Sequence, residues 1–122
     1  RELTVGILRD KALPVVEIVA VGGVYDFNAK YKATTTKYIA PADLDQNDAR
    51  RAQDLAERAH NALGCRSFSR VDIRMKPDGA MYVLEVNTIP GLTERSLLPM
   101  AAKAAGLDFT GLCGEILLSA LK

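Results

Sequence analysis

In two stretches of this chain, residues 69–75 and 81–87, polar and apolar residues alternate, and this pattern constrains the fold more than any other feature. A period of two is typical of a strand with one buried face. The five residues between the stretches include Pro77 and Gly79, which favour a tight turn. The sequence therefore predicts a β-hairpin over residues 69–87.

The alternation also predicts the register of this hairpin, with Asp72 opposite Glu85 and Arg70 opposite Asn87. The apolar pairs of the same register are Val71 with Val86, Ile73 with Leu84, and Met75 with Tyr82. A shift by one residue would place each apolar side chain opposite a polar one, so the pattern selects this pairing.

Directly opposed carboxylates at Asp72 and Glu85 repel each other and destabilise a sheet unless a cation lies between them. Their oxygens, together with the amide oxygen of Asn87, are ligands that a hard divalent cation such as Mg²⁺ accepts. The alternative is a solvated polar face that Arg70 and Arg74 neutralise. The hairpin alone leaves both interpretations open.

The residues after the hairpin add a second polar feature. Pro90 and Gly91 lie in a loop that leads into a predicted helix, which begins near residues 94–96. The N-terminus of a helix presents backbone N–H groups that bind anions. A metal face beside an anion site suggests chemistry on phosphate or carboxylate groups.

Five motifs, within residues 1–5, 25–31, 64–72, 85–93 and 96–99, occur in one order over nearly the whole chain. In these motifs the sequence resembles the C-terminal part of the D-alanine–D-alanine ligases, which belong to the ATP-grasp superfamily. The resemblance favours the metal interpretation over the solvated face. It implies an ATP-dependent ligase that activates one D-alanine as an acylphosphate, which the amine of a second D-alanine attacks. The expected product is the D-alanyl-D-alanine of peptidoglycan.

The resemblance also implies roles for individual residues. Asp72, Glu85 and Asn87 would hold Mg²⁺ or Mn²⁺, with two ions expected. Arg70 would act in catalysis by stabilising the acyl-transfer intermediate, and Glu2 would bind the ribose of ATP, although an exposed terminal charge is the alternative for Glu2. The carboxylate of the second D-alanine would be received by Gly91, Ser96 and Leu97. For Ser96, helix capping is an alternative that is compatible with this role.

A long segment, about residues 22–38, has neither strand nor helix periodicity and is interpreted as a lid over the active site. By resemblance it is the ω-loop of the family, in which Lys30 contacts the transferred phosphate and Tyr31 orders the second substrate. Asn28 departs from the Glu often seen there. The Lys-Tyr pair favours D-alanine over D-lactate as the second substrate. A surface loop with solvated lysines is the alternative.

The predicted fold class is α+β, an ATP-grasp C-terminal lobe in which an antiparallel sheet has helices packed on one face. Strands are expected at residues 3–8, 14–19 and 34–39, besides the hairpin. Helices are expected at about 45–63, 96–105 and 108–121. Asp45 or Asn47 would cap the first helix and Asp108 the last, and Gly64 and Gly106 would end the first two helices. Leu63, Leu117 and Leu121 are assigned to buried helix faces, and His60 to the surface.

Composition limits the other possibilities. The chain has 122 residues, of which 48% are hydrophobic, and a net charge of +1, so no nucleic-acid partner is indicated. No apolar run approaches the roughly 20 residues that a membrane span needs. The two cysteines lack metal-ligand spacing and are interpreted as buried free thiols of a cytoplasmic protein.

Arg1 is not an initiator methionine, and the first strand has no lead-in. The chain is therefore interpreted as a fragment. The resemblance implies that the parent enzyme is a homodimer whose upstream domains supply the other substrate sites, so the fragment alone is expected to be inactive. Two alternatives stay open. One is another ATP-grasp carboxylate–amine ligase or a D-alanine–D-lactate ligase, and the other is a non-catalytic interaction lobe.

Overall fold

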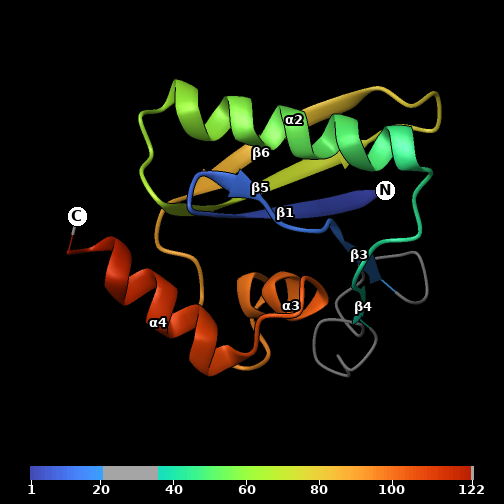
Figure 1. Ribbon diagram of the computed structural model, residues 1–122. Helices are drawn as coiled ribbons and strands as arrows, with labels where there is room; N and C mark the ends of the chain where they lie inside the picture. Colours follow the sequence, from blue (N-terminus) through green and yellow to red (C-terminus); the bar gives the residue numbers. More distant parts are fainter. Residues whose placement is uncertain (21–35, 122) are drawn as a thin grey trace, which may run out of the picture.

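The computed structural model describes residues 1–20 and 36–121 (Figure 1). Its strands are β1 (Glu2–Leu8), β2 (Lys11–Ala12), β3 (Val16–Ala20), β4 (Thr36–Ile39), β5 (Phe68–Met75) and β6 (Met81–Asn87). Its helices are α2 (Gln46–Ala62), α3 (Leu97–Ala104) and α4 (Phe109–Ser119). All the strands and helices expected in this part of the chain are present, and β2 is an additional short strand.

The strands form one antiparallel sheet in the order β4-β3-β1-β5-β6, with β2 paired to β1. Strands β1 and β5 are neighbours over seven residue pairs, from Glu2 opposite Arg74 to Leu8 opposite Phe68. The first and fifth strands of the chain therefore form the centre of the sheet, and the hairpin strand β6 forms an edge.

Helices cover both faces of this sheet. Helix α2 lies across one face, and α3 and α4 lie on the other (Figure 1). The predicted α+β antiparallel sheet is confirmed, but the expectation that its helices share one face is corrected. The reason is that β1 is buried on both sides over Leu3–Leu8, which a single layer of helices cannot achieve.

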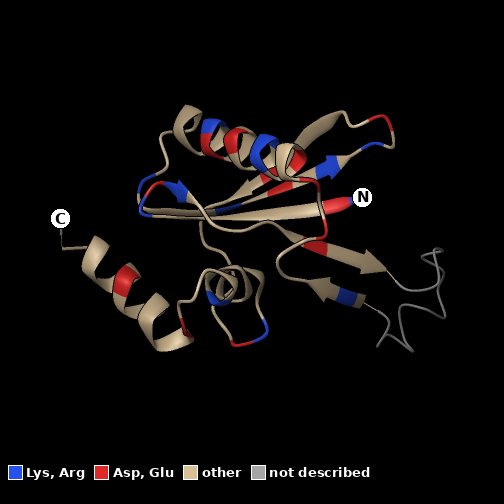
Figure 2. Ribbon diagram, turned by 45° about the vertical axis from the view of Figure 1, so that its right-hand side comes forward, with Lys and Arg blue, Asp and Glu red and all other residues tan. Residues whose placement is uncertain are grey.

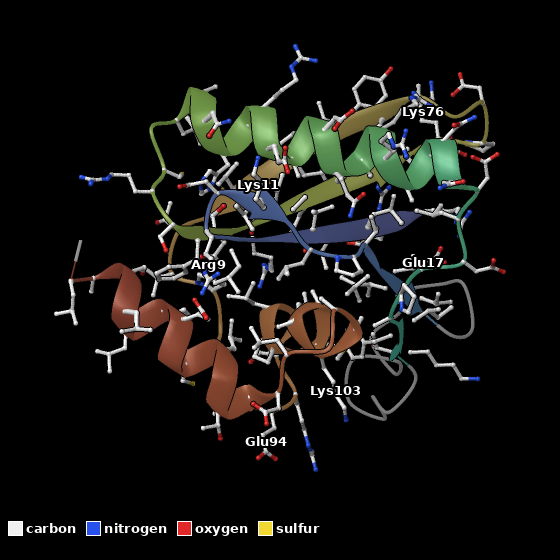
Figure 3. The ribbon with its side chains drawn as sticks, in the orientation of Figure 1. Arg9, Lys11, Glu17, Lys76, Glu94 and Lys103 are labelled. Atoms are coloured by element: carbon white, nitrogen blue, oxygen red, sulfur yellow. The ribbon has the colours of Figure 1, made fainter. Side chains whose placement is uncertain are left out.

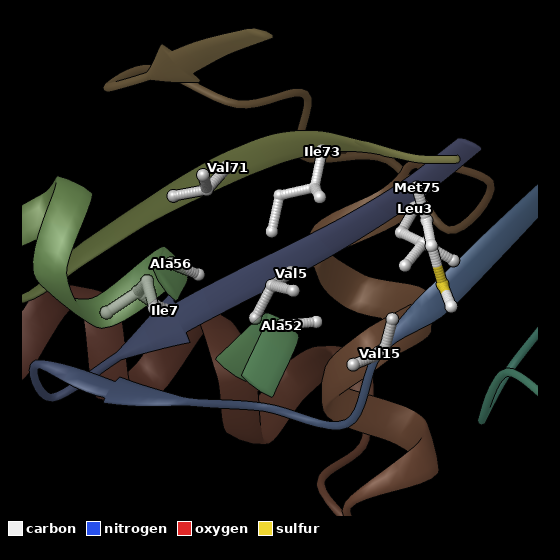
Figure 4. Packing of buried hydrophobic residues seen from close by; sticks show 9 residues of the cluster. All are labelled: Leu3, Val5, Ile7, Val15, Ala52, Ala56, Val71, Ile73 and Met75. Atoms are coloured by element: carbon white, nitrogen blue, oxygen red, sulfur yellow. The ribbon is translucent and has the colours of Figure 1, made fainter. Parts of the chain in front are cut away.

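The larger core lies between the sheet and α2. Side chains that alternate along β1 and β5 point to the same face and meet two alanines of α2. These buried residues are Leu3, Val5, Ile7, Val15, Ala52, Ala56, Val71, Ile73 and Met75 (Figure 4). Small alanines let the helix approach the sheet closely, so apolar packing fills most of this interface.

The second core lies on the opposite face and covers only one end of the sheet. It contains Leu8, Leu98, Ala102 and Leu112, which join β1 to α3 and α4. Gly6 allows this contact, because a Cβ atom on Gly6 would lie 2.7 Å from Leu98 Cδ1. On β1 and β5, the part of this face toward Glu2 carries polar side chains, such as those of Thr4 and Asp72.

The hairpin register is confirmed at one end and corrected at the other. Arg70 pairs with Asn87 and Asp72 with Glu85, as expected. A β-bulge then lets Ile73 pair with Val83 instead of Leu84, and Met75 with Met81 instead of Tyr82. A bulge inserts one unpaired residue and shifts every pair beyond it, which alternation alone does not reveal.

The helix boundaries follow their expected capping residues. Asp45 accepts hydrogen bonds from the N–H groups of Asn47 and Asp48 at the start of α2, and Asp108 accepts one from Gly111 N at the start of α4. Gly64 and Gly106 follow the ends of α2 and α3 with φ of +70° and +90°, a conformation that glycine adopts without strain.

Four assignments of helix side chains are wrong. Leu63, Leu117 and Leu121 are exposed, with 67–77% of their surface accessible. Leu63 and Leu121 lie just beyond the last residues of α2 and α4. His60 is fully buried instead of exposed. Both cysteines are free as expected, but they are only partly buried.

Charged residues are spread along α2, whereas α4 is nearly uncharged (Figure 2). Arg9, in the turn between β1 and β2, reaches α4 and donates a hydrogen bond from Nε to Glu115 Oε2 at 2.6 Å (Figure 3). None of the helices within residues 1–20 and 36–121 has the length and hydrophobicity of a membrane span.

Candidate active site

Four polar residues of the hairpin form a group on the sheet face that α3 partly covers. Arg70 and Asp72 alternate along β5, and Asn87 and Glu85 lie opposite them on β6. Residues two apart on a strand share a face, and so do directly paired residues. The predicted juxtaposition of Asp72, Glu85, Asn87 and Arg70 is therefore present in the structure.

Arg70 lies between the two carboxylates. Its Nε and Nη2 atoms are each 3.1 Å from Asp72, on Oδ1 and Oδ2 respectively, and Nη2 is 3.7 Å from Glu85 Oε1. The guanidinium group therefore offsets the repulsion between Asp72 and Glu85. The cation that the opposed carboxylates require is supplied, at least in part, by this arginine.

The two carboxylates differ in exposure. The side chain of Asp72 keeps 24% of its surface accessible and that of Glu85 keeps 60%. Asp72 also accepts a hydrogen bond from the hydroxyl of Thr4, with 2.8 Å between Thr4 Oγ1 and Asp72 Oδ1. Asp72 is thus held in place from two sides, while Glu85 stays accessible to solvent.

Two carboxylates and one amide oxygen fit the donor preference of Mg²⁺ or Mn²⁺. The Asn87 oxygen accepts a hydrogen bond from Ile89 N at 3.0 Å and has a second lone pair available. Within the described part of the chain, no three Asp, Glu, His or Cys residues converge on a metal position. Any cation held here would therefore need water or substrate oxygens as further ligands.

Glu2 lies at the start of β1 on the same face as this group. It is exposed and pairs with Arg74 of β5 on one side and with Ile18 of β3 on the other. Thr4, two residues further along β1, pairs with Asp72. Glu2 therefore lies two residues along β1 from the residue that pairs with Asp72.

The loop between β6 and α3 brings Gly91 and Ser96 together. A Cβ atom on Gly91 would lie 2.9 Å from Ser96 Oγ, so only glycine fits here without displacing the hydroxyl. Ser96 Oγ accepts a hydrogen bond from Thr93 N at 3.0 Å and lies 2.8 Å from Thr93 Oγ1. The hydroxyl is thereby fixed within the loop.

Ser96 is the N-cap residue of α3, but its side chain makes no capping hydrogen bond. Side-chain capping therefore does not account for this serine. The first helical residues, Leu97 and Leu98, present backbone N–H groups at the positive end of the helix dipole, and Pro99 has none. An anion such as a carboxylate would find two N–H donors and a hydroxyl in this region.

Helix α3 lies on the face that carries the hairpin group. Gly6 of β1 pairs with Arg70, and the space above Gly6 is filled by Leu98 and Ala101 of α3. Arg70 therefore points to the side of the sheet where α3 begins. Lys30 and Tyr31, assigned to the lid, lie outside the described residues.

Two polar contacts made by side chains of β5 were not expected from sequence. One is the bond from Thr4 to Asp72, which depends on a strand pairing between residues 68 positions apart. The other is buried His60, between Asp10 and Ser69, with Ser69 immediately before Arg70. The only sequence signal for these contacts is a polar residue at a position that is otherwise apolar. That signal does not identify the residue that forms the hydrogen bond.

A model of the family described as the C-terminus of D-ala D-ala ligases matches residues 1–118. Similar curated proteins include the D-alanine–D-alanine ligases of Alcanivorax borkumensis, 48% identical over 121 residues, and of Methylacidiphilum infernorum, 51% identical over 117 residues. The matched regions cover 99% and 96% of this chain and 39% of each relative.

Solved structures are similar as well. The D-alanine–D-alanine ligase of Bacillus anthracis complexed with ATP matches with a TM-score of 0.82 and 33% identity, over 98% of this chain and 38% of that one. The VanG D-Ala:D-Ser ligase of Enterococcus faecalis matches with a TM-score of 0.80 and 35% identity, over 95% of this chain and 35% of that one. This chain thus spans less than two fifths of the length of these relatives.

Proposed function

Because the chain belongs to the family of D-alanine–D-alanine ligase C-terminal regions, we propose that it carries the phosphate-binding and acceptor-binding part of an ATP-dependent ligase. The enzyme would join two D-alanine molecules into D-alanyl-D-alanine for peptidoglycan. The activity of the related D-alanine–D-alanine ligases supports this proposal, and one related structure is a complex with ATP.

The observation that carries the proposal is the cluster of Arg70, Asp72, Glu85 and Asn87 on one face of the hairpin. Phosphoryl transfer from ATP to a carboxylate depends mainly on positioning and on neutralisation of phosphate charge. A rigid antiparallel pair of strands holds such side chains in register. The proposed role of this face is therefore to bind the phosphates of ATP and the acylphosphate formed from the first D-alanine.

Asp72, Glu85 and Asn87 would hold the divalent cations, with two ions proposed. Bound Mg²⁺ or Mn²⁺ would supply charge neutralisation for the phosphate oxygens. Arg70 already contacts both carboxylates, and its guanidinium has five N–H donors. We propose that Arg70 stabilises the negative charge that develops when the amine attacks the acylphosphate.

The second D-alanine would bind with its carboxylate against the Ser96 hydroxyl and the N–H group of Leu97. A side chain at position 91 would crowd the hydroxyl that this ligand needs, because a Cβ atom there would lie 2.9 Å from Ser96 Oγ. Glu2 is proposed to bind the ribose of ATP. Lys30 and Tyr31 are proposed to belong to a lid over the reacting groups. The homodimeric state and the cytoplasmic location are parts of the same proposal.

The test uses the full-length protein with ATP, Mg²⁺ and D-alanine, and measures both phosphate release and dipeptide formation. We expect Arg70→Met to lower kcat by about 10²–10³-fold, the usual cost of losing a group that stabilises developing charge. Asp54→Asn, an exposed acid on α2, is the matched control and should leave kcat unchanged.

The preference for the second substrate distinguishes the proposed activity from the alternative functions. D-alanine, D-serine, D-lactate and an L-amino acid are supplied in parallel, and a D-alanine–D-alanine ligase turns over D-alanine best. Preference for D-lactate or for an L-amino acid would replace the proposed substrate. Absence of turnover with every acceptor in a folded full-length protein would leave the non-catalytic lobe as the better description.

A further inference from the structure

Thr4 is a polar residue in the most buried strand of the protein. It lies in the middle of β1, has 1% of its surface exposed, and is directly opposite Asp72 of β5. Its Oγ1 atom is 2.8 Å from Asp72 Oδ1 and 3.4 Å from the backbone oxygen of Val71. Because an ionised carboxylate only accepts hydrogen bonds, the hydroxyl donates to Asp72, the nearer and stronger acceptor.

The two oxygens of Asp72 are not equivalent as a result. Oδ1 accepts from Thr4 Oγ1 and from Arg70 Nε, whereas Oδ2 accepts from Arg70 Nη2, its one protein donor within the described residues. Each carboxylate oxygen has about two lone-pair positions. Both positions on Oδ1 are thus used, and one position on Oδ2 is free.

We propose that Thr4 is a positioning residue that orients Asp72 so that Oδ2 is the oxygen offered to a divalent cation. This inference rests on the proposed function, in which Asp72 is a metal ligand. Partners that hydrogen-bond to a metal-binding carboxylate fix its orientation, and their loss commonly weakens metal affinity about 10–100-fold. Arg70 fixes the plane of the same carboxylate, and Thr4 holds Oδ1 against β1.

A purely structural role would make a different prediction. If the Thr4 hydroxyl only satisfies a polar atom in the strand, valine of nearly the same shape would change stability without changing cation binding at Asp72. Thr4→Val removes the hydroxyl but keeps the branched shape, and Thr4→Ser keeps the hydroxyl. The pair therefore separates the hydrogen bond from packing.

The measurement is binding of Mn²⁺ to the full-length protein with saturating ADP, followed by the electron paramagnetic resonance signal of free Mn²⁺. We expect Thr4→Val to weaken Mn²⁺ binding by about 10-fold or more, and Thr4→Ser to restore binding close to that of the parent. Val5→Ala is the matched control, because it perturbs the same strand but faces the core beneath α2. It should bind Mn²⁺ like the parent.

Asp72→Asn distinguishes an error in the proposed metal role of Asp72 from an error in the positioning role of Thr4. If this variant binds Mn²⁺ like the parent, the metal role of Asp72 itself is wrong. If Asp72→Asn weakens binding but Thr4→Val does not, the positioning role of Thr4 is overturned while the proposed function stands. Equal weakening by Val5→Ala would also overturn it, since strand perturbation would then suffice. Should Thr4→Val fail to fold, Thr4→Ala is compared with Thr4→Ser in the same assay.

Discussion

The Nε2 atom of His60 lies 2.8 Å from Oδ1 of Asp10, which ties the end of α2 to the turn between β1 and β2. On its other side, His60 Nδ1 lies 2.7 Å from Ser69 Oγ. Since the carboxylate only accepts hydrogen bonds, Nε2 carries the proton that is shared with Asp10. Although Ser69, His60 and Asp10 are linked in a chain, Ser69 does not act as a nucleophile, because it is fully buried in β5 and no substrate can reach it. The role of these three residues is to join three elements.

Replacement of His60 by alanine is expected to destabilise the protein by about 2–5 kcal/mol, because it opens a cavity and leaves the buried Ser69 hydroxyl unpaired. Urea denaturation of the purified protein measures the change. Arg58→Ala, at an exposed position of the same helix, should stay within about 0.5 kcal/mol of the parent. Equal stability of both variants would show that the His60 contacts contribute nothing.

Acid should weaken the fold through two carboxylates. The hydrogen bond from His60, with a second from Ser67 N, lowers the pKa of Asp10, and the hydrogen bonds from Arg1 lower the pKa of Glu17. In both cases the folded pKa lies below the unfolded one, so the unfolded chain binds more protons in acid. The added stability is present above the unfolded pKa and is lost as the pH falls through the folded one.

The free energy of unfolding is therefore expected to decrease as the pH is lowered below about 4, near the unfolded pKa of these groups. Asp10→Asn and Glu17→Gln should each flatten this dependence, measured by denaturation between pH 7 and pH 3. Asp54→Asn, an exposed acid for comparison, should follow the parent curve. A steeper decrease in either variant would contradict the assignment.

Gly6 should not tolerate a side chain. A Cβ atom there would lie 2.7 Å from Leu98 Cδ1 and 3.2 Å from Leu13 Cδ1, in a packed core, so Gly6→Ala is expected to cost about 1–3 kcal/mol. Gly114 in α4 has open space around it, and Gly114→Ala should be neutral or stabilising by up to about 1 kcal/mol. Thermal unfolding of the two variants gives the comparison, and equal unfolding temperatures would refute it.

Gly91→Ala tests the acceptor site without removing a functional group. The new methyl group would displace the Ser96 hydroxyl from its bonds with Thr93, since the two atoms would lie 2.9 Å apart. We expect a raised KM for the second D-alanine in the full-length enzyme, with an unchanged KM for ATP. Thermal stability should change little, because the loop is exposed. A raised KM for ATP alone would place the acceptor elsewhere.

Local patterns predicted much of this protein. Alternation in the hairpin placed Asp72 opposite Glu85, and capping residues such as Asp45 and Asp108 marked where helices begin. These features depend on neighbours a few residues apart, so sequence spacing is sufficient to predict them. The order of five motifs was likewise enough to indicate the family.

Contacts between distant segments were decided by the tertiary structure. The alternation of β1 did not reveal that α3 and α4 would cover its second face, or that Thr4 would bond to Asp72 from 68 residues away. The bulge between Asp72 and Ile73 and the burial of His60 escaped prediction for the same reason. Hydrogen bonds and packing between elements depend on which strands become neighbours, and that is settled only when the whole sheet assembles.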